Sequence, residues 1–446
     1  MIDLAALRTR LADARLRPVG LRRIVAGRDA LDALPEVVDE LAPDGTIGVL
    51  VDATLMRRRG TDVKAAVHDL LFRMRRDVRT VVAGPADGQV HADEATVAAV
   101  HSALSSPAVL VTVGSGTLAD IGKTTGLPHV IVQTAASVNG FADDQSVLLR
   151  DGVKRTLPSR WPDALILDED ILADAPAAMN RAGLGDLLSM FTAPADWYLA
   201  SAVGQDDSFA PTAVAIAREH GEELLDAADQ PVRLAELLAV SGISMGAAGR
   251  TAPSSGMEHT ISHLLDMAAK GPNALHGAQV GVATVIAALT WRHVRRRIAE
   301  DGLRVMFPDA DSMRRRVEAA FDPIDPTGAM TRECLADYLA KLTRWHGSKE
   351  TLSGLAAAWP QHERTLDTLL AEPDRLVDAL RKAGAPVRFS QLDPAVDPDT
   401  ARWAVTNCHL MRDRFTVADL AWFLGAWTDA DVDAVLAEAS TLDAGL

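Results

Sequence analysis

Short, continuously apolar segments alternate with amphipathic segments along the first third of the chain. The apolar segments are rich in β-branched residues and cover residues 46–52, 80–83, 108–113 and 129–133, whereas residues 92–104 have helical periodicity. Continuously apolar strands separated by helices are typical of a parallel sheet that is covered on both faces. We therefore expect an N-terminal α/β, Rossmann-like domain of the kind that binds dinucleotides.

The pattern changes after residue 176. Strand signals become rare, and long segments rich in alanine and leucine follow at residues 212–228, 233–246, 278–300, 311–320 and 331–345. From residue 347 on the pattern stays helical, with breaks at prolines. We predict an α/β domain over residues 1–176 and an all-helical domain over residues 177–446, with the ligand in the cleft where they meet.

Composition adds limits on location and partners. The 446 residues are 48% hydrophobic and carry a formal net charge of -16, which argues against nucleic acid or an anionic membrane as the main partner. The N-terminal residues lack the apolar stretch of a signal peptide, and residues 277–291, the longest apolar segment, are too short to span a bilayer. Cys334 and Cys408 have no metal-ligand spacing. We expect a cytoplasmic protein with reduced thiols and no membrane insertion.

A glycine turn follows the third apolar segment. Gly114, Ser115 and Gly116 separate that strand from a helical segment that carries Asp120 and Lys123. Backbone N–H groups and the helix dipole favour a pyrophosphate at such a turn, where a Cβ would hinder its approach. The motif alone is a weak signal, because a plain tight turn with a charged pair on the following helix would give the same pattern.

Polar residues at the ends of two other predicted strands support a cofactor site. Thr134 and Ser137 follow one strand and Asp52 ends another, and the carboxyl ends of parallel strands form the ligand edge of such a sheet. A carboxylate there accepts hydrogen bonds from the adenosine ribose and repels a 2′-phosphate. We therefore predict a site that includes Asp120 and favours NAD(H) over NADP(H). A loop-capping role for Asp52 stays open.

Three histidines follow one another closely in the helical half. His259 and His263 are four residues apart, on one helix face, and His276 follows His259 by 276 − 259 = 17 residues. With Asp186 of the earlier GLGD segment, two of these imidazoles suit a catalytic Zn²⁺, Fe²⁺ or Ni²⁺ and leave positions open for substrate oxygens. A single histidine is more often structural, so spacing alone leaves a metal site and a structural role equally open.

The order of these motifs resembles one enzyme superfamily. GSG, QTAAS, AGLGD, SGMEH and LHG follow the order of the superfamily that joins iron-containing alcohol dehydrogenases, glycerol dehydrogenase, glycerol-1-phosphate dehydrogenase and dehydroquinate synthase. Residues 24–286 most resemble the glycerol-1-phosphate dehydrogenase branch. The resemblance implies a dehydroquinate synthase-like fold, dependence on NAD(P)(H) and one divalent metal ion, and a homodimer. Zinc is the first choice of metal, with nickel and iron as alternatives.

The resemblance also implies roles for individual residues. The metal ligands correspond to Asp186, His259 and His276. The cofactor positions correspond to Asp52, Gly114, Ser115, Gly116, Thr134 and Ser137.

Three more residues are expected at the substrate: His263, Lys154 and Asn139. Asn139 departs from the family pattern, which has an aspartate at this position. Asparagine keeps the size and the hydrogen bonds of aspartate but not its charge, and Asp143 and Asp144, which follow closely, are alternatives for that charge.

The expected reaction is reversible hydride transfer between NAD(P)(H) and a small polyol phosphate, with sn-glycerol-1-phosphate and dihydroxyacetone phosphate as the pair that the resemblance implies. Two alternatives stay open: a sugar-phosphate cyclase of the dehydroquinate synthase type, which uses the same cofactors, and a nucleotide-binding or scaffold protein without activity. Asp186 favours the dehydrogenase, because the cyclase branch prefers glutamate there.

Overall fold

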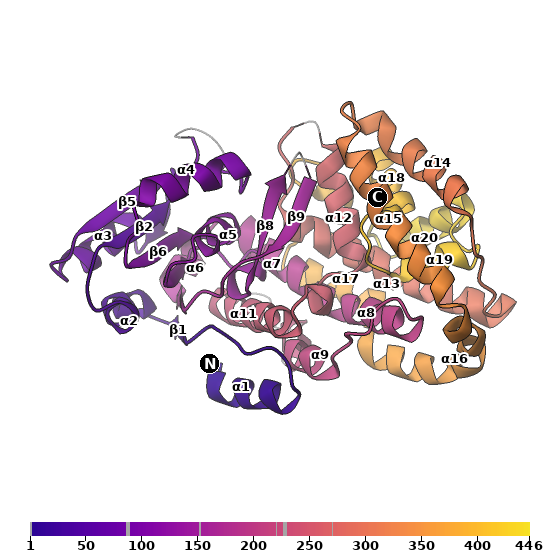
Figure 1. Ribbon diagram of the computed structural model, residues 1–446, viewed down its shortest axis with the longest axis horizontal. Coiled ribbons are helices and arrows are strands. Elements are labelled where there is room, and N and C mark those ends of the chain that lie inside the picture. The colour runs from indigo at the N-terminus through magenta and orange to yellow at the C-terminus, as the bar shows by residue number, and fades with distance from the viewer. Residues whose placement is uncertain (1, 86–89, 151–152, 220, 226–229, 270) are drawn as a thin grey trace. The chain divides into compact units, whose positions relative to one another are not determined.

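The chain forms two compact units, seen in a computed structural model (Figure 1) that describes residues 2–85, 90–150, 153–219, 221–225, 230–269 and 271–446. The first, here the sheet unit, comprises Met1–Leu187 and Ala215–Thr251. The second, here the helical unit, comprises Leu188–Val214 and Ala252–Leu446.

A six-stranded sheet organises the sheet unit, and its strands follow the order β1-β10-β7-β6-β2-β5. Every neighbouring pair is parallel, as the continuous apolar segments predicted. The strands are β1 (Arg23–Gly27), β2 (Ile47–Val51), β5 (Val78–Val82), β6 (Val109–Gly114), β7 (His129–Gln133) and β10 (Ala164–Asp168).

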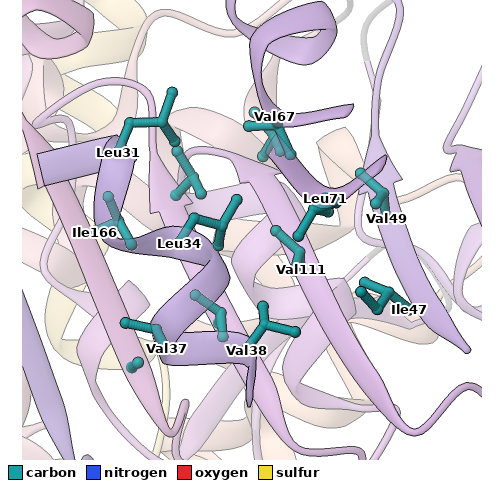
Figure 2. Packing of buried hydrophobic residues seen from close by; sticks show 14 of the residues in the cluster. Leu31, Leu34, Val37, Val38, Ile47, Val49, Val67, Leu71, Val111 and Ile166 are labelled. Atoms are coloured by element: carbon teal, nitrogen blue, oxygen red, sulfur yellow. The ribbon is translucent and has the colours of Figure 1, made fainter. Parts of the chain in front are cut away.

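Both faces of this sheet are buried. In β2, Ile47, Val49 and Val51 pack into one apolar cluster with α2 (Leu34–Leu41) and α3 (Val63–Phe72). Leu50 belongs to a second cluster, with α4 (Glu94–Leu104) and α5 (Gly116–Lys123). Figure 2 shows side chains of the first cluster gathering from both helices and the strands. A strand buried on both faces needs apolar residues at every position, which explains its uninterrupted hydrophobic pattern.

The sheet unit also contains elements that the sequence pattern did not predict. These include β1, β10 and an antiparallel hairpin of β8 (Gln145–Arg150) and β9 (Val153–Pro158). The remaining elements are α1 (Leu4–Asp13), β3 (Arg57–Arg58), β4 (Thr61–Asp62), α6 (Glu169–Asp174), α7 (Ala177–Leu188), α10 (Gly221–Leu224) and α11 (Pro231–Ala248). Helix α9 (Pro211–Arg218) has residues in both units. The units differ from the predicted domains, because α11 packs on β1, β10 and α6.

Helices form the helical unit around α13 (His276–Asp301), which contacts α12 (Met257–Ala268), α17 (Pro373–Lys382), α19 (Val417–Phe423) and α20 (Asp429–Thr441). The others are α8 (Ala193–Ala202), α14 (Ala310–Phe321), α15 (Ala329–Gly347), α16 (Lys349–Leu369) and α18 (Pro398–Asn407). Cys334 and Cys408 are buried thiols that form no disulfide. Among the described residues, no helix has both the length and the apolar composition needed to cross a membrane.

Candidate functional site

The glycine turn joins β6 directly to α5. A Cβ on Gly114 would lie 2.5 Å from Leu118 Cδ1, and one on Gly116 would lie 2.6 Å from Val138 Cγ2, so both positions require glycine for packing. Ser115 is the N-cap residue, but its side chain makes no capping hydrogen bond. The first backbone N–H groups of α5 therefore suit an anionic ligand, which fits the pyrophosphate of a dinucleotide.

The predicted adenosine and nicotinamide contacts lie at the same sheet edge. β2 and β7 are the two neighbours of β6, and Thr134 N donates to Gly114 O at 3.1 Å. Asp52 accepts from Thr54 N and Oγ1, both at 3.0 Å, so it caps its own loop. Each carboxylate oxygen keeps a second lone pair, which leaves the ribose role open as well.

A basic side chain lies beside Asp52. Lys64 Nζ is 3.7 Å from Asp52 Oδ1 and donates to Thr54 O at 2.6 Å. This ammonium partly offsets the charge of the carboxylate that would face the adenosine ribose.

Asp120 and Lys123 form a buried cluster behind the glycine turn. Lys123 Nζ lies 3.3 Å from Asp120 Oδ1 and 2.8 Å from Asp143 Oδ1, and it donates to Gly140 O at 2.6 Å. Burial raises the pKa of Asp120 to about 6, against the lowering effect of Lys123. Lys123 thus connects α5 to the loop over residues 134–144 through hydrogen bonds. The expected contact between Asp120 and the cofactor stays a prediction.

This loop contacts Asp186 through its backbone. Asn139 N donates to Asp186 Oδ2 at 2.9 Å, whereas the Asn139 side chain donates from Nδ2 to Ser241 Oγ on α11 at 3.2 Å. A Cβ on Gly183 of α7 would lie 1.8 Å from Ala136 O, so α7 requires glycine there to approach the loop. The residue that departs from the family pattern therefore positions Asp186 with its main chain, which any residue type supplies.

Three imidazoles come together in the helical unit. His259 and His263 lie on α12 and His276 begins α13. The ring centroid of His276 is 5.2 Å from that of His259 and 5.6 Å from that of His263. The predicted helical spacing is thus confirmed.

Glu258 fixes the orientation of the His259 ring. Glu258 Oε1 lies 3.0 Å from His259 Nδ1, and Oε2 accepts from Thr192 Oγ1 at 2.9 Å. Burial raises the pKa of Glu258, but hydrogen bonds from His259 and Gly256 N outweigh it, so the pKa lies below its usual value. An ionised carboxylate only accepts, so His259 Nδ1 carries the proton and Nε2 is the nitrogen able to bind a metal.

A chain of hydrogen bonds fixes the orientation of the His276 ring. His276 Nδ1 lies 2.9 Å from Ser262 Oγ, which donates to Gln279 Oε1 at 2.6 Å. Gln279 Nε2 in turn donates to Asp266 Oδ1 at 3.1 Å. Since the serine proton goes to Gln279, Ser262 accepts from His276 Nδ1, and Nε2 carries the lone pair that a metal requires.

Asp196 connects the start of α12 to two other helices. It accepts from Met257 N at 2.8 Å, Val417 N at 2.9 Å and Trp291 Nε1 at 3.1 Å. Burial and the nearby Glu258 raise its pKa well above the usual value. A Cβ on Gly256 would lie 2.6 Å from Asp196 Oδ2, so the residue before α12 also requires glycine.

Asp186, His259 and His276 form a candidate metal-binding group. Each offers one ligand atom, and these atoms lie within 4.8 Å of one another. One carboxylate and two neutral imidazoles that can use Nε2 fit a divalent ion such as zinc, nickel or iron. Of the residues expected at the substrate, His263 lies beside this group, whereas the side chain of Lys154 is outside the part of the chain that the structure describes.

The supporting groups of the two histidines were missed from the sequence, although a signal for some of them exists. Glu258 directly precedes His259 and Gln279 follows His276 by three residues, whereas Ser262 bonds His276 from the neighbouring helix and has no such local relation to it. Residues three apart share a helix face, so polar side chains at these positions are candidates for support of a neighbouring ligand.

Replacing Ser262 with alanine is expected to weaken metal affinity about 10–100-fold, because His276 loses the partner that fixes its tautomer. Metal affinity measured by competition with a chromogenic chelator would test this. Thr260→Ala is the matched control: it removes a buried hydroxyl of α12 that donates to Met257 O and should leave the affinity unchanged. Equal affinities for Ser262→Ala and the unmodified protein would argue against a supporting role.

Known proteins resemble this chain over most of its length. Residues 25–176 match the family described as iron-containing alcohol dehydrogenase. The glycerol-1-phosphate dehydrogenase (NAD(P)+) of Bacillus subtilis is 29% identical over 421 residues, which cover 91% of this chain and 92% of that protein. The enzyme of the same name from Bacillus licheniformis is 30% identical over 416 residues, covering 90% and 88%.

Solved structures agree with the fold. The crystal structure of glycerol dehydrogenase from Schizosaccharomyces pombe has a TM-score of 0.57 and 15% sequence identity, and the match covers 95% of this chain and 91% of that one. The predicted arrangement, a parallel-sheet α/β region followed by a largely helical region, is confirmed.

Proposed function

Because this chain belongs to the iron-containing alcohol dehydrogenase family, we propose that it transfers a hydride between NAD(P)(H) and a small polyol phosphate. The proposed substrate pair is sn-glycerol-1-phosphate and dihydroxyacetone phosphate, which the names of its relatives suggest. The observation that carries the proposal is the grouping of ligand atoms from Asp186, His259 and His276 within 4.8 Å.

These three side chains would hold the metal ion. A divalent ion bound there lowers the pKa of a substrate hydroxyl and polarises a carbonyl in the reverse direction. The chain contributes by presenting two Nε2 lone pairs, since Glu258 and Ser262 hold the Nδ1 protons of His259 and His276. With three protein ligands from the described residues, coordination positions would stay open for substrate oxygens.

The sheet unit would hold the dinucleotide, which supplies the hydride chemistry. The N–H groups at the start of α5 would bind its pyrophosphate, and Thr134 and Ser137 would flank the nicotinamide half. Both residues are 7% exposed, as expected for groups that line a water-poor reaction site.

His263 is the residue we assign to proton exchange with the substrate hydroxyl. It lies one helical turn after His259 on α12, and the residue is 9% exposed. It is outside the metal-ligand group, so its ring can exchange a proton instead of serving as a ligand.

Asp52→Asn is expected to raise the ratio of kcat/KM with NADP(H) to kcat/KM with NAD(H) about tenfold. This is equivalent to ~1.4 kcal/mol. Asparagine keeps an oxygen for Thr54 N but removes the charge that repels a 2′-phosphate, and Lys64 remains to attract one. Initial rates with both cofactors measure the ratio. Lys64→Met should lower this ratio. An unchanged ratio in Asp52→Asn would show that Asp52 does not contact the adenosine ribose.

A substrate screen tests the function itself. Purified protein loaded in turn with Zn²⁺, Ni²⁺ or Fe²⁺ is assayed with NAD(H) and NADP(H), with glycerol-1-phosphate and dihydroxyacetone phosphate heading the panel. Net NADH formation is expected with glycerol-1-phosphate. A phosphate-releasing reaction without net NADH would indicate the cyclase instead, and metal-loaded protein without turnover on any polyol phosphate would argue for a binding protein.

The cytoplasmic location and the homodimer expected from the sequence stay predictions. Sedimentation of the purified protein would test the latter.

A further inference from the structure

A cavity of about 490 Å³ lies in the sheet unit, away from the glycine turn. Arg17 and Arg22 line it from the segment before β1, and Arg160, Trp161 and Asp163 line it from the segment before β10. β1 and β10 are parallel neighbours, so these residues stand at the amino ends of the strands. The cofactor turn follows the carboxyl end of β6, at the opposite edge of the same sheet.

Cationic groups dominate the exposed surface of this cavity. The side chains of Arg17, Arg22 and Arg160 are 54%, 65% and 36% exposed, whereas their carboxylate partners Asp144 and Asp163 are 8% and 4% exposed. The carboxylates therefore lie beneath the guanidinium groups. On a chain with a net charge of -16, three clustered arginines form a local site for an anion.

The acidic partners orient these arginines. Arg17 Nη2 lies 2.6 Å from Asp144 Oδ2, and Asp163 accepts from Arg160 Nη2 at 2.8 Å. Arg22 Nε lies 3.2 Å from Asp163 Oδ1. A carboxylate engages only part of a guanidinium, which has five N–H donors, so each arginine keeps donors for a ligand.

One carboxylate oxygen of a residue that lines the cavity lacks a donor. Within the described part of the chain, Asp144 Oδ1 is buried and has no hydrogen-bond partner. Leaving a buried carboxylate oxygen without a partner is unfavourable, so a ligand with an O–H group would be favoured here. Trp161 forms a rigid side of the cavity, because its ring packs closely against two glycines. A Cβ on Gly20 would lie 2.7 Å from the Trp161 side chain, and one on Gly246 would lie 2.3 Å from it.

We propose that this cavity binds a small phosphate monoester that carries a free hydroxyl group, at a site separate from the reaction centre. The arginines engage the phosphate oxygens through charge-assisted hydrogen bonds, and Asp144 Oδ1 accepts from the hydroxyl. The proposal is independent of the proposed dehydrogenase activity, since none of its residues belongs to the metal or cofactor groups and Asp144, an alternative considered for the charge at the substrate, pairs with Arg17.

Fluorine NMR of the whole protein labelled with 5-fluorotryptophan tests the proposal at one residue. The resonance of Trp161 is identified by its loss in Trp161→Phe. Glycerol-3-phosphate and inorganic phosphate are titrated separately, with potassium chloride at matched ionic strength. A saturable shift of the Trp161 resonance is expected with both phosphates but not with chloride, and glycerol-3-phosphate should bind more tightly.

Variants identify the groups responsible. Arg22→Gln should weaken phosphate binding at least tenfold, whereas Arg73→Gln, a change of an exposed arginine at the end of α3, should not. Asp144→Asn should abolish the preference for glycerol-3-phosphate over inorganic phosphate. Binding should persist in His259→Ala, which separates this site from the metal group.

Three outcomes would overturn the proposal: no saturable shift in the unmodified protein, an equal shift with chloride, or undiminished binding in folded Arg22→Gln. Far-UV circular dichroism shows whether each variant is folded. If Arg22→Gln does not fold, the same comparison is made with Arg160→Gln.

Discussion

His276→Ala is expected to abolish stoichiometric metal binding and to lower kcat/KM by about 10³-fold or more. This is equivalent to ~4 kcal/mol of transition-state stabilisation. Two ligands would remain of the three whose atoms lie within 4.8 Å of one another, and a carboxylate with one imidazole holds a divalent ion weakly. His259→Ala should have the same effect. Elemental analysis of the purified variants, together with initial rates in added metal, provides the measurement.

His263→Ala is the matched control, because it removes an imidazole from the same helix face without removing a ligand. It should keep a full complement of metal while turnover falls. If His276→Ala retained the metal and His263→Ala lost it, the assignment of ligands would be wrong, although the family membership would stand.

Gly183→Ala is expected to destabilise the protein by about 3 kcal/mol and to lower its melting temperature by about 3 °C. The added Cβ would lie 1.8 Å from Ala136 O, and a backbone carbonyl can move only if the loop or α7 shifts. Such a shift also displaces Asp186, which lies three residues later on the same helix and accepts from Asn139 N. Activity should therefore fall even at temperatures where the variant is folded.

Gly354→Ala provides the contrasting case. Gly354 is inside α16, and a Cβ there would meet nothing within 4 Å. Because alanine loses less backbone entropy in a helix, this change should stabilise the protein by about 0.5–1 kcal/mol. Differential scanning calorimetry measures both variants, and a Gly183→Ala protein as stable as the unmodified one would show that the contact relaxes freely.

Continuously apolar strands such as β7 were predictable from sequence, whereas the hairpin strands β8 and β9 were not, and β10 was missed although all of its residues are buried. The structure places β7 at His129–Gln133, the residues that the apolar pattern predicted. β8 and β9 were missed because residues such as Gln145 and Arg155 interrupt any apolar pattern, and their pairing depends on the partner strand.

The candidate site was only partly predictable for a related reason. Helical spacing places His259 and His263 on one face of α12, which local geometry alone determines. Asp186 stands 259 − 186 = 73 residues earlier, and no local rule relates positions so distant, so the resemblance to a family supplied that residue. The same resemblance implies Asn139 at the substrate; its Nδ2 donates to Ser241 Oγ, and its role toward a substrate stays a prediction.

Glu258 and the Ser262–Gln279–Asp266 chain, which orient His259 and His276, belong to the helical unit. Both rings are thus held rigid before an ion arrives, unlike the ligands of domains that fold only around their metal. The apoprotein should accordingly keep α12 and α13 intact after chelation and regain its ion without refolding.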